Sequence, residues 1–379
     1  MLVVKAWKIL LILVAVLLAW SLLVTSFRYS DPARWPKSVS HFSNELRDKA
    51  LAHIENETLG FEHVFAIGMK ERPDKRDFLT LAAIETGFEV DWLDGVRPSE
   101  LRQKAMPNGY DISSTVPTII ACWRAHMNAM FEVVQRGYSS ALIFEDDADW
   151  DVNIRSQLRE FARGLHALQG NGHASTQHPY GVDWDLLWIG GCGSAPFPNE
   201  TQFYAVRDDP TCPNVEHRGM LGGVPDSWKV HFPEDSTRFS FKAEAGCCLY
   251  GYAVSNRGAR KILAELELDH IEVPVDNALS DLCGGRSGRQ QIDCYALFPQ
   301  IIGTYRRAGP SSRDSDIASY DENLIHEEES WNMVYSVRRN IQRLVAGEVT
   351  VYSQWNDQPW TAKEVNPRQF THPKGQLVT

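Results

Sequence analysis

Three consecutive carboxylates follow an apolar segment in the stretch ALIFEDDADW, residues 141–150. Ala141–Phe144 is typical of a buried strand, and Glu145, Asp146 and Asp147 come directly after it. Like charges this close repel one another, and loss of water raises the energetic cost for each of them. Something positive is therefore expected nearby, and the open question is whether solvent, a basic side chain or a metal ion offsets these charges.

Hard divalent cations such as Mg²⁺ and Mn²⁺ take oxygen ligands and often join a carboxylate to phosphate groups. A strand that ends in Glu-Asp-Asp can supply one or two of these ligands. The alternative is a solvated acidic turn, because Asp favours turns. We interpret Asp149 and Asp151, which follow, as solvated turn acids of this kind.

Alternating strands and helices must position these carboxylates. Apolar runs predict strands at 63–68, 88–96, 141–144, 184–191, 249–255 and 295–302, and helical spacing predicts helices at 74–87, 117–137, 153–168 and 256–268. This order predicts an α/β fold, a mostly parallel sheet with helices on both faces. Such sheets bind ligands at the carboxyl ends of their strands, where the acidic cluster lies. The long Pro-, Gly- and Asp-rich segment 192–246 is expected to be a functional or mobile loop.

Composition narrows the class of protein. The 379 residues are 43% hydrophobic, which is enough for one large domain or two small ones, and the net charge of −11 argues against a nucleic-acid partner. Residues 9–26 carry no charge and nearly span a bilayer core of ~30 Å at helical rise. Lys5 and Lys8 precede them, so we expect an uncleaved signal anchor with the N-terminus in the cytoplasm. A cleaved signal peptide is the alternative.

The expected organisation is a cytoplasmic tail (1–8), a transmembrane signal anchor (9–26), a stem (27–60), a globular domain (61–352) and an irregular C-terminal tail (353–379). This is a single-pass type II topology in the Golgi or endoplasmic reticulum. The seven cysteines show no zinc-type spacing, and some could pair in an oxidising lumen. Asn-Glu-Thr sequons at Asn56 and Asn199 agree with the secretory pathway.

Several segments, taken in order, carry a family resemblance. The helix–turn–strand segment from Thr118 to Trp150 resembles glycosyltransferase family 25, which includes bacterial lipooligosaccharide and procollagen galactosyltransferases. Further similar blocks, over about residues 61–317, are FAIGMKERPDKRDFL, DWLDGV, GYAVSNRGARKIL, VPVDNAL, YALFPQII and SSRDSDI. Three features depart from the family pattern: Ala121-Cys122-Trp123 replaces the more usual Gly-Cys-x run, segment 192–246 is longer than in bacterial members, and the stem and anchor are extra. These departures bear on the acceptor more than on the reaction.

The resemblance implies a GT-A-like fold, a UDP-sugar donor and Mn²⁺ or another divalent cation. It makes Asp147 the metal ligand and places Glu145 and Asp146 near the nucleotide ribose or the ion. Arg72 and Arg76 would meet uracil, ribose or phosphate, although an exposed helix start explains them equally well. Asp94 matches the Asp-Gly end of the second strand and is assigned to the donor side.

Two further residues have competing interpretations. His126 lies beside the apolar stripe of its helix, so a structural hydrogen bond and a donor contact are both open. Asp276, in PVDNALSD, matches the Pro-x-Asp block and is the candidate catalytic base on the acceptor side. The alternative for Asp276 is an N-cap for the helix that follows.

The expected function is metal-assisted transfer of a hexose, with galactose as the expectation, from a UDP-sugar to a hydroxyl of a glycan or glycoprotein. Inversion at the sugar carbon is implied by the resemblance. A catalytically inactive lumenal binding or adhesion module of the same fold is the alternative. A metal-dependent phosphohydrolase would also use Asp clusters, but it would need His or Asp ligands beside the first strand, and FAIGMKERP supplies none.

Overall fold

The computed structural model describes residues 48–379 apart from 109, 171–177, 220, 270 and 318–321. The chain divides into two compact units, Met1–Leu46 and Arg47–Thr379, and every described residue belongs to the second. The expected cytoplasmic tail and signal anchor lie outside the described residues, as does most of the stem. Within the described part, no helix combines the length and the apolar character needed to cross a bilayer.

In the described part of the chain, residues 48–52 are α-helical, and the α-helices that follow them are α3 (Pro73–Glu85), α4 (Pro117–Arg136), α5 (Ile154–Leu168), α6 (Asp226–His231), α7 (Asn256–Leu263), α8 (Val275–Gly284) and α9 (Val337–Val345). A π-helical turn, η8 (Ala264–Asp269), continues α7. Short 3₁₀ turns are η2 (His53–Glu55), η3 (Pro98–Glu100), η4 (Gln103–Ala105), η5 (Ile112–Ser114), η7 (Val215–His217) and η9 (Ser311–Arg313).

The strands are β1 (His63–Gly68), β2 (Asp91–Asp94), β3 (Ser140–Glu145), β4 (Ala148–Trp150), β5 (Leu186–Gly190), β6 (Gly193–Pro196), β7 (Phe203–Val206), β8 (Leu221–Gly222), β9 (Arg238–Cys247), β10 (Gly251–Ser255), β11 (Cys294–Phe298), β12 (Ile302–Arg306), β13 (Gly309–Pro310), β14 (Ile325–His326), β15 (Glu329–Ser330), β16 (Val351–Tyr352), β17 (Glu364–Val365) and β18 (Gln376–Val378).

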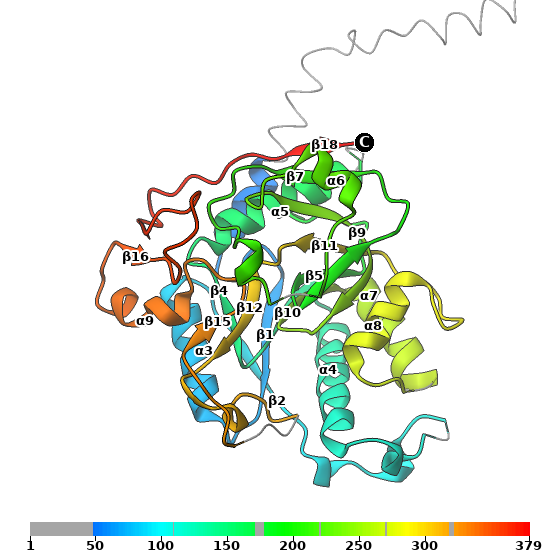
Figure 1. Cartoon of the computed structure of the whole chain (residues 1–379). Helices are drawn as coiled ribbons and strands as arrows, with labels where there is room; N and C mark the ends of the chain where they lie inside the picture. The colour runs from blue at the N-terminus through cyan, green and yellow to red at the C-terminus, as the bar shows by residue number, and fades with distance from the viewer. Residues whose placement is uncertain (1–47, 109, 171–177, 220, 270, 318–321) are drawn as a thin grey trace, which may run out of the picture. The chain divides into compact units, whose positions relative to one another are not determined.

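One large sheet organises the domain, with the strand order β18-β7-β9-β11-β5-β10-β3-β1-β2 (Figure 1). Strand β1 pairs in parallel with β2 and β3, and β11 pairs in parallel with β5. Strand β10 lies antiparallel between β3 and β5, so β2, β1, β3, β5 and β11 share one direction. The predicted α/β class is confirmed, with a parallel core interrupted by β10 and extended by antiparallel β9, β7 and β18. This arrangement is compatible with the GT-A-like expectation.

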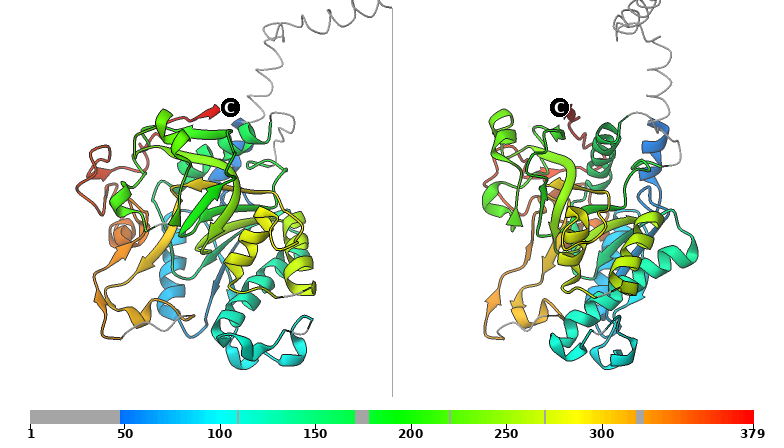
Figure 2. Two further views of the ribbon diagram at one scale, coloured as in Figure 1. Left: turned by 45° about the vertical axis from the view of Figure 1, so that its right-hand side comes forward. Right: turned by 90° about the vertical axis from the view of Figure 1, so that its right-hand side faces the viewer.

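Side chains alternate between the two faces of the sheet, as the period-2 pattern of a strand requires. In β1, Phe65 and Ile67 join one buried cluster, whereas Val64 and Ala66 join the other. Helices α4, α7 and α8 contribute to the first cluster, and α3 and α5 contribute to the second. Figures 1 and 2 show these helices on the two sides of the sheet, and the expected helices on both faces are thereby confirmed.

Helix α4 follows the predicted pattern closely. Pro117 occupies its first turn, and Gly137 ends it in the left-handed conformation at φ +72°, where glycine carries no Cβ penalty. Trp123 and Met127 are almost fully buried, which anchors the helix on the sheet. Removing the Trp123 side chain would cost about 3–5 kcal/mol on the scale of large-to-small core substitutions. The first half of α4 is thus held firmly beside the ends of β1 and β3.

Three segments differ from the sequence prediction. Segment 192–246 contains four strands and α6, and the main chains of β7 and β9 pair into the main sheet. The described end of the stem belongs to the domain, since Leu51, Ile54 and Leu59 are buried in its core. In the tail, β18 pairs with β7 and β17 pairs with β16, although most of residues 353–379 is irregular as expected.

Candidate functional site

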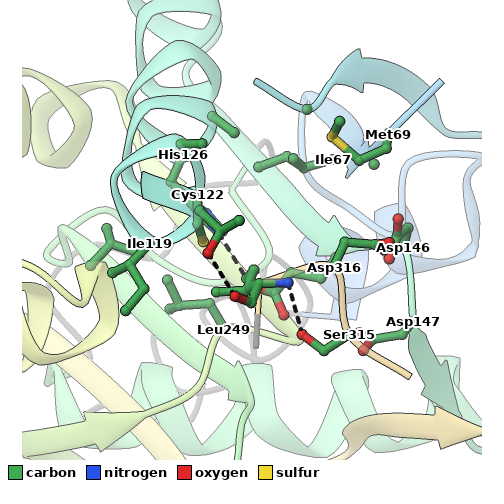
Figure 3. A pocket seen from close by; sticks show the side chains of 18 of the residues that line it. Ile67, Met69, Ile119, Cys122, His126, Asp146, Asp147, Leu249, Ser315 and Asp316 are labelled. Atoms are coloured by element: carbon green, nitrogen blue, oxygen red, sulfur yellow. Dashed lines mark hydrogen bonds and ion pairs between the residues drawn. The ribbon is translucent and has the colours of Figure 1, made fainter. Parts of the chain in front are cut away.

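A pocket of about 420 Å³ lies where the carboxyl ends of β1 and β3 meet the first halves of α4 and α8. Ile67 is paired with Glu145 across the parallel β1–β3 ladder, so both strands end at the same edge of the sheet. The volume is in the range of small-molecule sites. Figure 3 shows Cys122 and His126 on one side of this pocket and Asp146 and Asp147 on the other.

Each of the three consecutive carboxylates has its own positively charged or potentially charged neighbour. Glu145 Oε1 lies 3.3 Å from His126 Nε2. Asp146 Oδ1 lies 3.1 Å from Lys75 Nζ, and Asp147 Oδ2 lies 3.1 Å from Arg306 Nη1. Basic side chains therefore already offset part of the charge at the end of β3.

Lys75 is the central cation of this cluster and is only 9% exposed. Its Nζ lies 3.0 Å from Asp316 Oδ2 as well as beside Asp146, and Arg72 donates two hydrogen bonds to Asp316. Burial acts to lower the pKa of Lys75, but Asp147, Asp146 and Asp316 outweigh it and raise that pKa. Lys75 is thus held protonated inside the pocket.

One shared ammonium does not offset all the nearby carboxylates. Burial raises the pKa of Asp146 to about 6, with the neighbouring Asp147 acting in the same direction and Lys75 acting against it. Both shifts favour the protonated form, which is charged for Lys75 and neutral for Asp146. A further cation near Asp146 and Asp147 would favour both ionised carboxylates.

Arg338 supplies buried positive charge beneath the cluster. Its Nη2 donates to the main-chain oxygen of Asp146 at 2.8 Å, and its guanidinium stacks on the rings of Phe78 and Tyr305. The burial of Arg338 lowers its pKa from 12.5, although Asp149 and the other acids oppose that shift. α9, far away in the sequence, therefore supports the loop after β3.

The interpretation of Asp149 and Asp151 as solvated turn acids is wrong. Asp149 is fully buried and accepts hydrogen bonds from the hydroxyls of Ser330 and Ser336 and from the N–H groups of Trp150 and Arg338. Asp151 is 1% exposed and accepts from the main chain of Tyr335. Both carboxylates join the loop after β3 to the segment around α9 and serve the fold beneath the pocket.

His126 makes the structural contact that the sequence left open, and it also lines the pocket. It is 1% exposed, and its Nδ1 lies 2.9 Å from the hydroxyl of Tyr252 on β10, which is a structural contact. Its other nitrogen faces Glu145. The residue one helical turn earlier on α4, Cys122, lines the pocket as well.

Asp276 also lines the pocket, at the start of α8. Its Oδ2 accepts a hydrogen bond of 2.9 Å from the N–H of Cys248, and its Oδ1 accepts one of 3.0 Å from the N–H of Asn277. The residue at the N-cap position is Pro274, so the carboxylate does not cap α8 in the way that the alternative proposed. The Asp276 carboxylate is half-buried and lines the pocket.

The fit of a divalent cation can be judged from Asp147. Its Oδ1 is buried, and among the residues that the structure describes none forms a hydrogen bond with it. A buried acceptor without a partner costs about 1–3 kcal/mol. Asp147 thus offers one oxygen fixed by Arg306 and one oxygen free to bind a cation, which suits a hard ion such as Mn²⁺.

The pocket gathers five of the eight residues singled out in the sequence: His126, Glu145, Asp146, Asp147 and Asp276. The other three lie outside the described lining. Arg72 forms an ion pair with Asp316, which lines the pocket. Arg76 lies 3.1 Å from Asp94, and Lys70 also forms an ion pair with Asp94.

Sequence reasoning missed Lys75, Arg306 and Asp316. Lys75 lies between the two arginines that were selected, and Asp316 lies in the SSRDSDI block. Arg306, in TYRRAG, could not be assigned to the site from local sequence because its partner Asp147 is far away in the sequence.

Comparison with known proteins finds that this chain is similar to curated members of the glycosyltransferase 25 family. A Bos taurus protein described as "Probable inactive glycosyltransferase 25 family member 3" is 27% identical over 291 residues, which cover 70% of this chain and 41% of that protein. The Homo sapiens "Inactive glycosyltransferase 25 family member 3" is 28% identical over 160 residues, 38% of this chain and 25% of that protein. Procollagen galactosyltransferase 1 of Danio rerio is 22% identical over 241 residues, 61% of this chain and 33% of that protein.

This chain therefore matches between about a quarter and two fifths of the length of these relatives. No family model matches it. Among solved structures, mannose-1-phosphate geranyltransferase from Thermus thermophilus aligns with 67% of this chain and 64% of its own, at 9% identity and a TM-score of 0.25. That structural likeness is too small to support an argument about fold or function.

Proposed function

We propose that this chain is a nucleotide-sugar-dependent hexosyltransferase that moves a hexose, with galactose as the expectation, from a UDP-sugar to a hydroxyl of a glycan or glycoprotein. The observation that supports it best is Asp147, one of whose oxygens contacts Arg306 while the other is buried and has no hydrogen-bond partner among the described residues. The likeness to procollagen galactosyltransferases supports the same class of reaction.

In this proposal, the donor diphosphate lies at the ends of β1 and β3. Lys75 and Arg306 face that position and would stabilise its negative charge. A divalent cation such as Mn²⁺ would be held by Asp147, with Glu145 and Asp146 near the ion or ribose, and would favour departure of the nucleotide as a Lewis acid. The added positive charge would oppose the burial that raises the pKa of Asp146.

The transfer itself requires an attacking hydroxyl and a base. The bond between the sugar carbon and the diphosphate oxygen breaks while the acceptor oxygen bonds to the same carbon from the opposite face, giving inversion. Asp276 faces the pocket and would accept the hydroxyl proton. General-base catalysis of this kind contributes roughly 10²–10⁴ to the rate.

The secretory lumen is the proposed location, with residues 9–26 as a signal anchor. Two disulfide bonds, Cys192–Cys248 and Cys283–Cys294, support an oxidising compartment. The sequons at Asn56 and Asn199 agree with a secretory location, since both asparagines are exposed.

A catalytically inactive binding module is the second candidate, because two of the three relatives described above are named as inactive. Such a protein has no need of an unpartnered carboxylate oxygen or of a buried lysine at the end of a strand. Burying these groups costs free energy, and the transferase would give that cost a function, so the transferase is the better candidate.

A donor panel distinguishes the candidates. Purified full chain is incubated with a set of UDP-sugars and other nucleotide sugars, with and without Mn²⁺, and nucleotide release is measured together with hydrolysis of a simple phosphate ester. The proposal expects Mn²⁺-stimulated release of UDP from one donor, which Asp147→Asn abolishes and the exposed control Asp77→Asn retains. UDP binding without turnover on any acceptor would favour the inactive module, and ester hydrolysis alone would favour a phosphohydrolase.

A further inference from the structure

Cys122, His126 and Glu145 form a compact group of ligating side chains on one wall of the pocket. Their ligating atoms all lie within 4.8 Å of one another. We propose that this group binds a borderline divalent cation of the zinc type, at a site separate from the oxygen site at Asp147. The proposal depends on these three side chains alone and does not rest on the proposed transferase activity.

The distances suit a tetrahedral ion. Zinc binds nitrogen and oxygen at about 2.0–2.1 Å and thiolate sulfur at about 2.3 Å, so ligating atoms around one tetrahedral ion lie roughly 3.3–3.6 Å apart. The observed separation of His126 Nε2 and Glu145 Oε1 is 3.3 Å. The three ligating atoms lie within 4.8 Å of one another, so an ion among them would draw the side chains closer together.

The main chain also presents the three ligands in a suitable way. Cys122 and His126 lie four residues apart on α4, so their side chains share one face of the helix. Glu145 is the last residue of β3, which is buried along most of its length. Two rigid elements therefore hold the three ligands, as a preorganised site requires.

The contacts around His126 indicate which nitrogen would face the ion. Its Nδ1 lies 2.9 Å from the hydroxyl of Tyr252, and Nε2 faces Glu145. Metal-binding histidines almost always use their other ring nitrogen in such an outer contact, which sets the ring orientation and the tautomer. The hydroxyl of Tyr252, a fully buried residue on β10, would make this outer contact.

The thiol of Cys122 is available for ligation. Cys122 is half-buried and lies outside both disulfide bonds. All three residues line the pocket, so an ion bound by them would keep one position open to the cavity. Three protein ligands with an open fourth position is the arrangement of catalytic zinc sites, whereas structural sites are closed by four protein ligands.

Ligand chemistry separates this site from the one at Asp147. Thiolate and imidazole favour zinc-type ions, whereas carboxylate oxygens favour Mg²⁺ and Mn²⁺. Figure 3 shows Cys122 and His126 across the pocket from Asp146 and Asp147. Two ions of different preference could therefore occupy one pocket without sharing the Asp147 oxygens.

Cobalt(II) titration of the metal-free full chain tests this site, because a Co²⁺–thiolate bond gives a near-ultraviolet charge-transfer band that oxygen ligands do not. We expect one equivalent of Co²⁺ to produce the band and one equivalent of Zn²⁺ to remove it, while excess Mn²⁺ leaves it in place. Cys122→Ser should abolish the band, and Cys247→Ser, which changes another half-buried free thiol, should preserve it.

Tyr252→Phe gives a second readout that a purely structural role would not produce. It keeps all three ligands and removes only the outer hydroxyl, so the band should persist while the affinity for Zn²⁺ falls about 10–100-fold. A folded wild-type chain without the band overturns the proposal. Survival of the band in Cys122→Ser, or its removal by Mn²⁺, also overturns it, because the ion would then lie elsewhere.

Discussion

Replacing Asp151 by asparagine isolates the pH dependence of one buried carboxyl group. Asp151 is 1% exposed, and its oxygens accept hydrogen bonds from the main chain of Asn153 at 2.9 Å and of Tyr335 at 3.0 Å. Burial outweighs these hydrogen bonds and raises the pKa of Asp151 to about 7. The Oδ1 of Asn153 has no partner among the described residues, so a turn of this amide would provide an acceptor for the added proton.

The sign of the effect follows from the two protonation states. The carboxyl pKa is 3.8 in the unfolded reference and about 7 in the folded protein. Between these values the folded chain keeps a proton that the unfolded chain has lost, so the free energy of unfolding falls as pH rises. About three pH units at ~1.4 kcal/mol each correspond to about 4 kcal/mol of stability, which is present in full below the lower pKa and is lost above the upper one.

The assay compares Asp151→Asn with the wild type by urea unfolding from about pH 4 to about pH 8, with the disulfides kept intact. Asparagine resembles the protonated carboxyl group and does not ionise. The stability of the variant relative to the wild type should therefore rise with pH by up to about 4 kcal/mol. Other titrating groups cancel in this difference, and the exposed control Asp77→Asn should show no such slope. A difference that is independent of pH, or that falls as pH rises, would refute the reasoning.

Three further variants test the neighbouring groups. Asp149→Asn should lower the free energy of unfolding in urea by about 1–3 kcal/mol, because its amide would face hydroxyl and N–H donors that now bind a carboxylate; a change within about 0.5 kcal/mol would contradict this. Asp276→Asn should reduce kcat by roughly 10²–10⁴ while UDP affinity, measured by calorimetry, stays within a few-fold; a parallel fall in Tm would instead indicate a structural role. Lys75→Met should weaken UDP binding about 10–100-fold, the equivalent of one charge-assisted hydrogen bond, and unchanged affinity would exclude Lys75 from the donor site.

Local patterns were sufficient to predict the core of the fold. The helical spacing and terminal Pro and Gly of α4, and the apolar runs of β1, β3 and β5, are signals carried by consecutive residues. Strands β7 and β9 were missed because they are stabilised by pairing with distant strands, while Pro, Gly and Asp dominate the composition around them. The pairing of β18 with β7 is similarly non-local.

The same distinction explains what was found of the site. The sequence located the acidic residues because they end a recognisable strand, but it did not locate the cations that face them. Arg306 is 159 residues from Asp147, and Asp316 is 241 residues from Lys75. Asp149 was misjudged for this reason, since its partners Ser330 and Ser336 come from 181 and 187 residues further along the chain.

Calorimetric titration of UDP, with and without Mn²⁺, tests the proposed donor site most directly when it is performed on the wild type, Asp147→Asn and the exposed control Asp77→Asn. Asp147→Asn keeps the shape of the side chain but replaces a carboxylate by an amide, which is a poorer ligand for a hard cation. We predict that the wild type and Asp77→Asn bind UDP more tightly in Mn²⁺, whereas Asp147→Asn stays folded and loses this gain. Mn²⁺-dependent UDP binding that is unchanged in Asp147→Asn would contradict the assignment of this residue as the metal ligand of a nucleotide-sugar site.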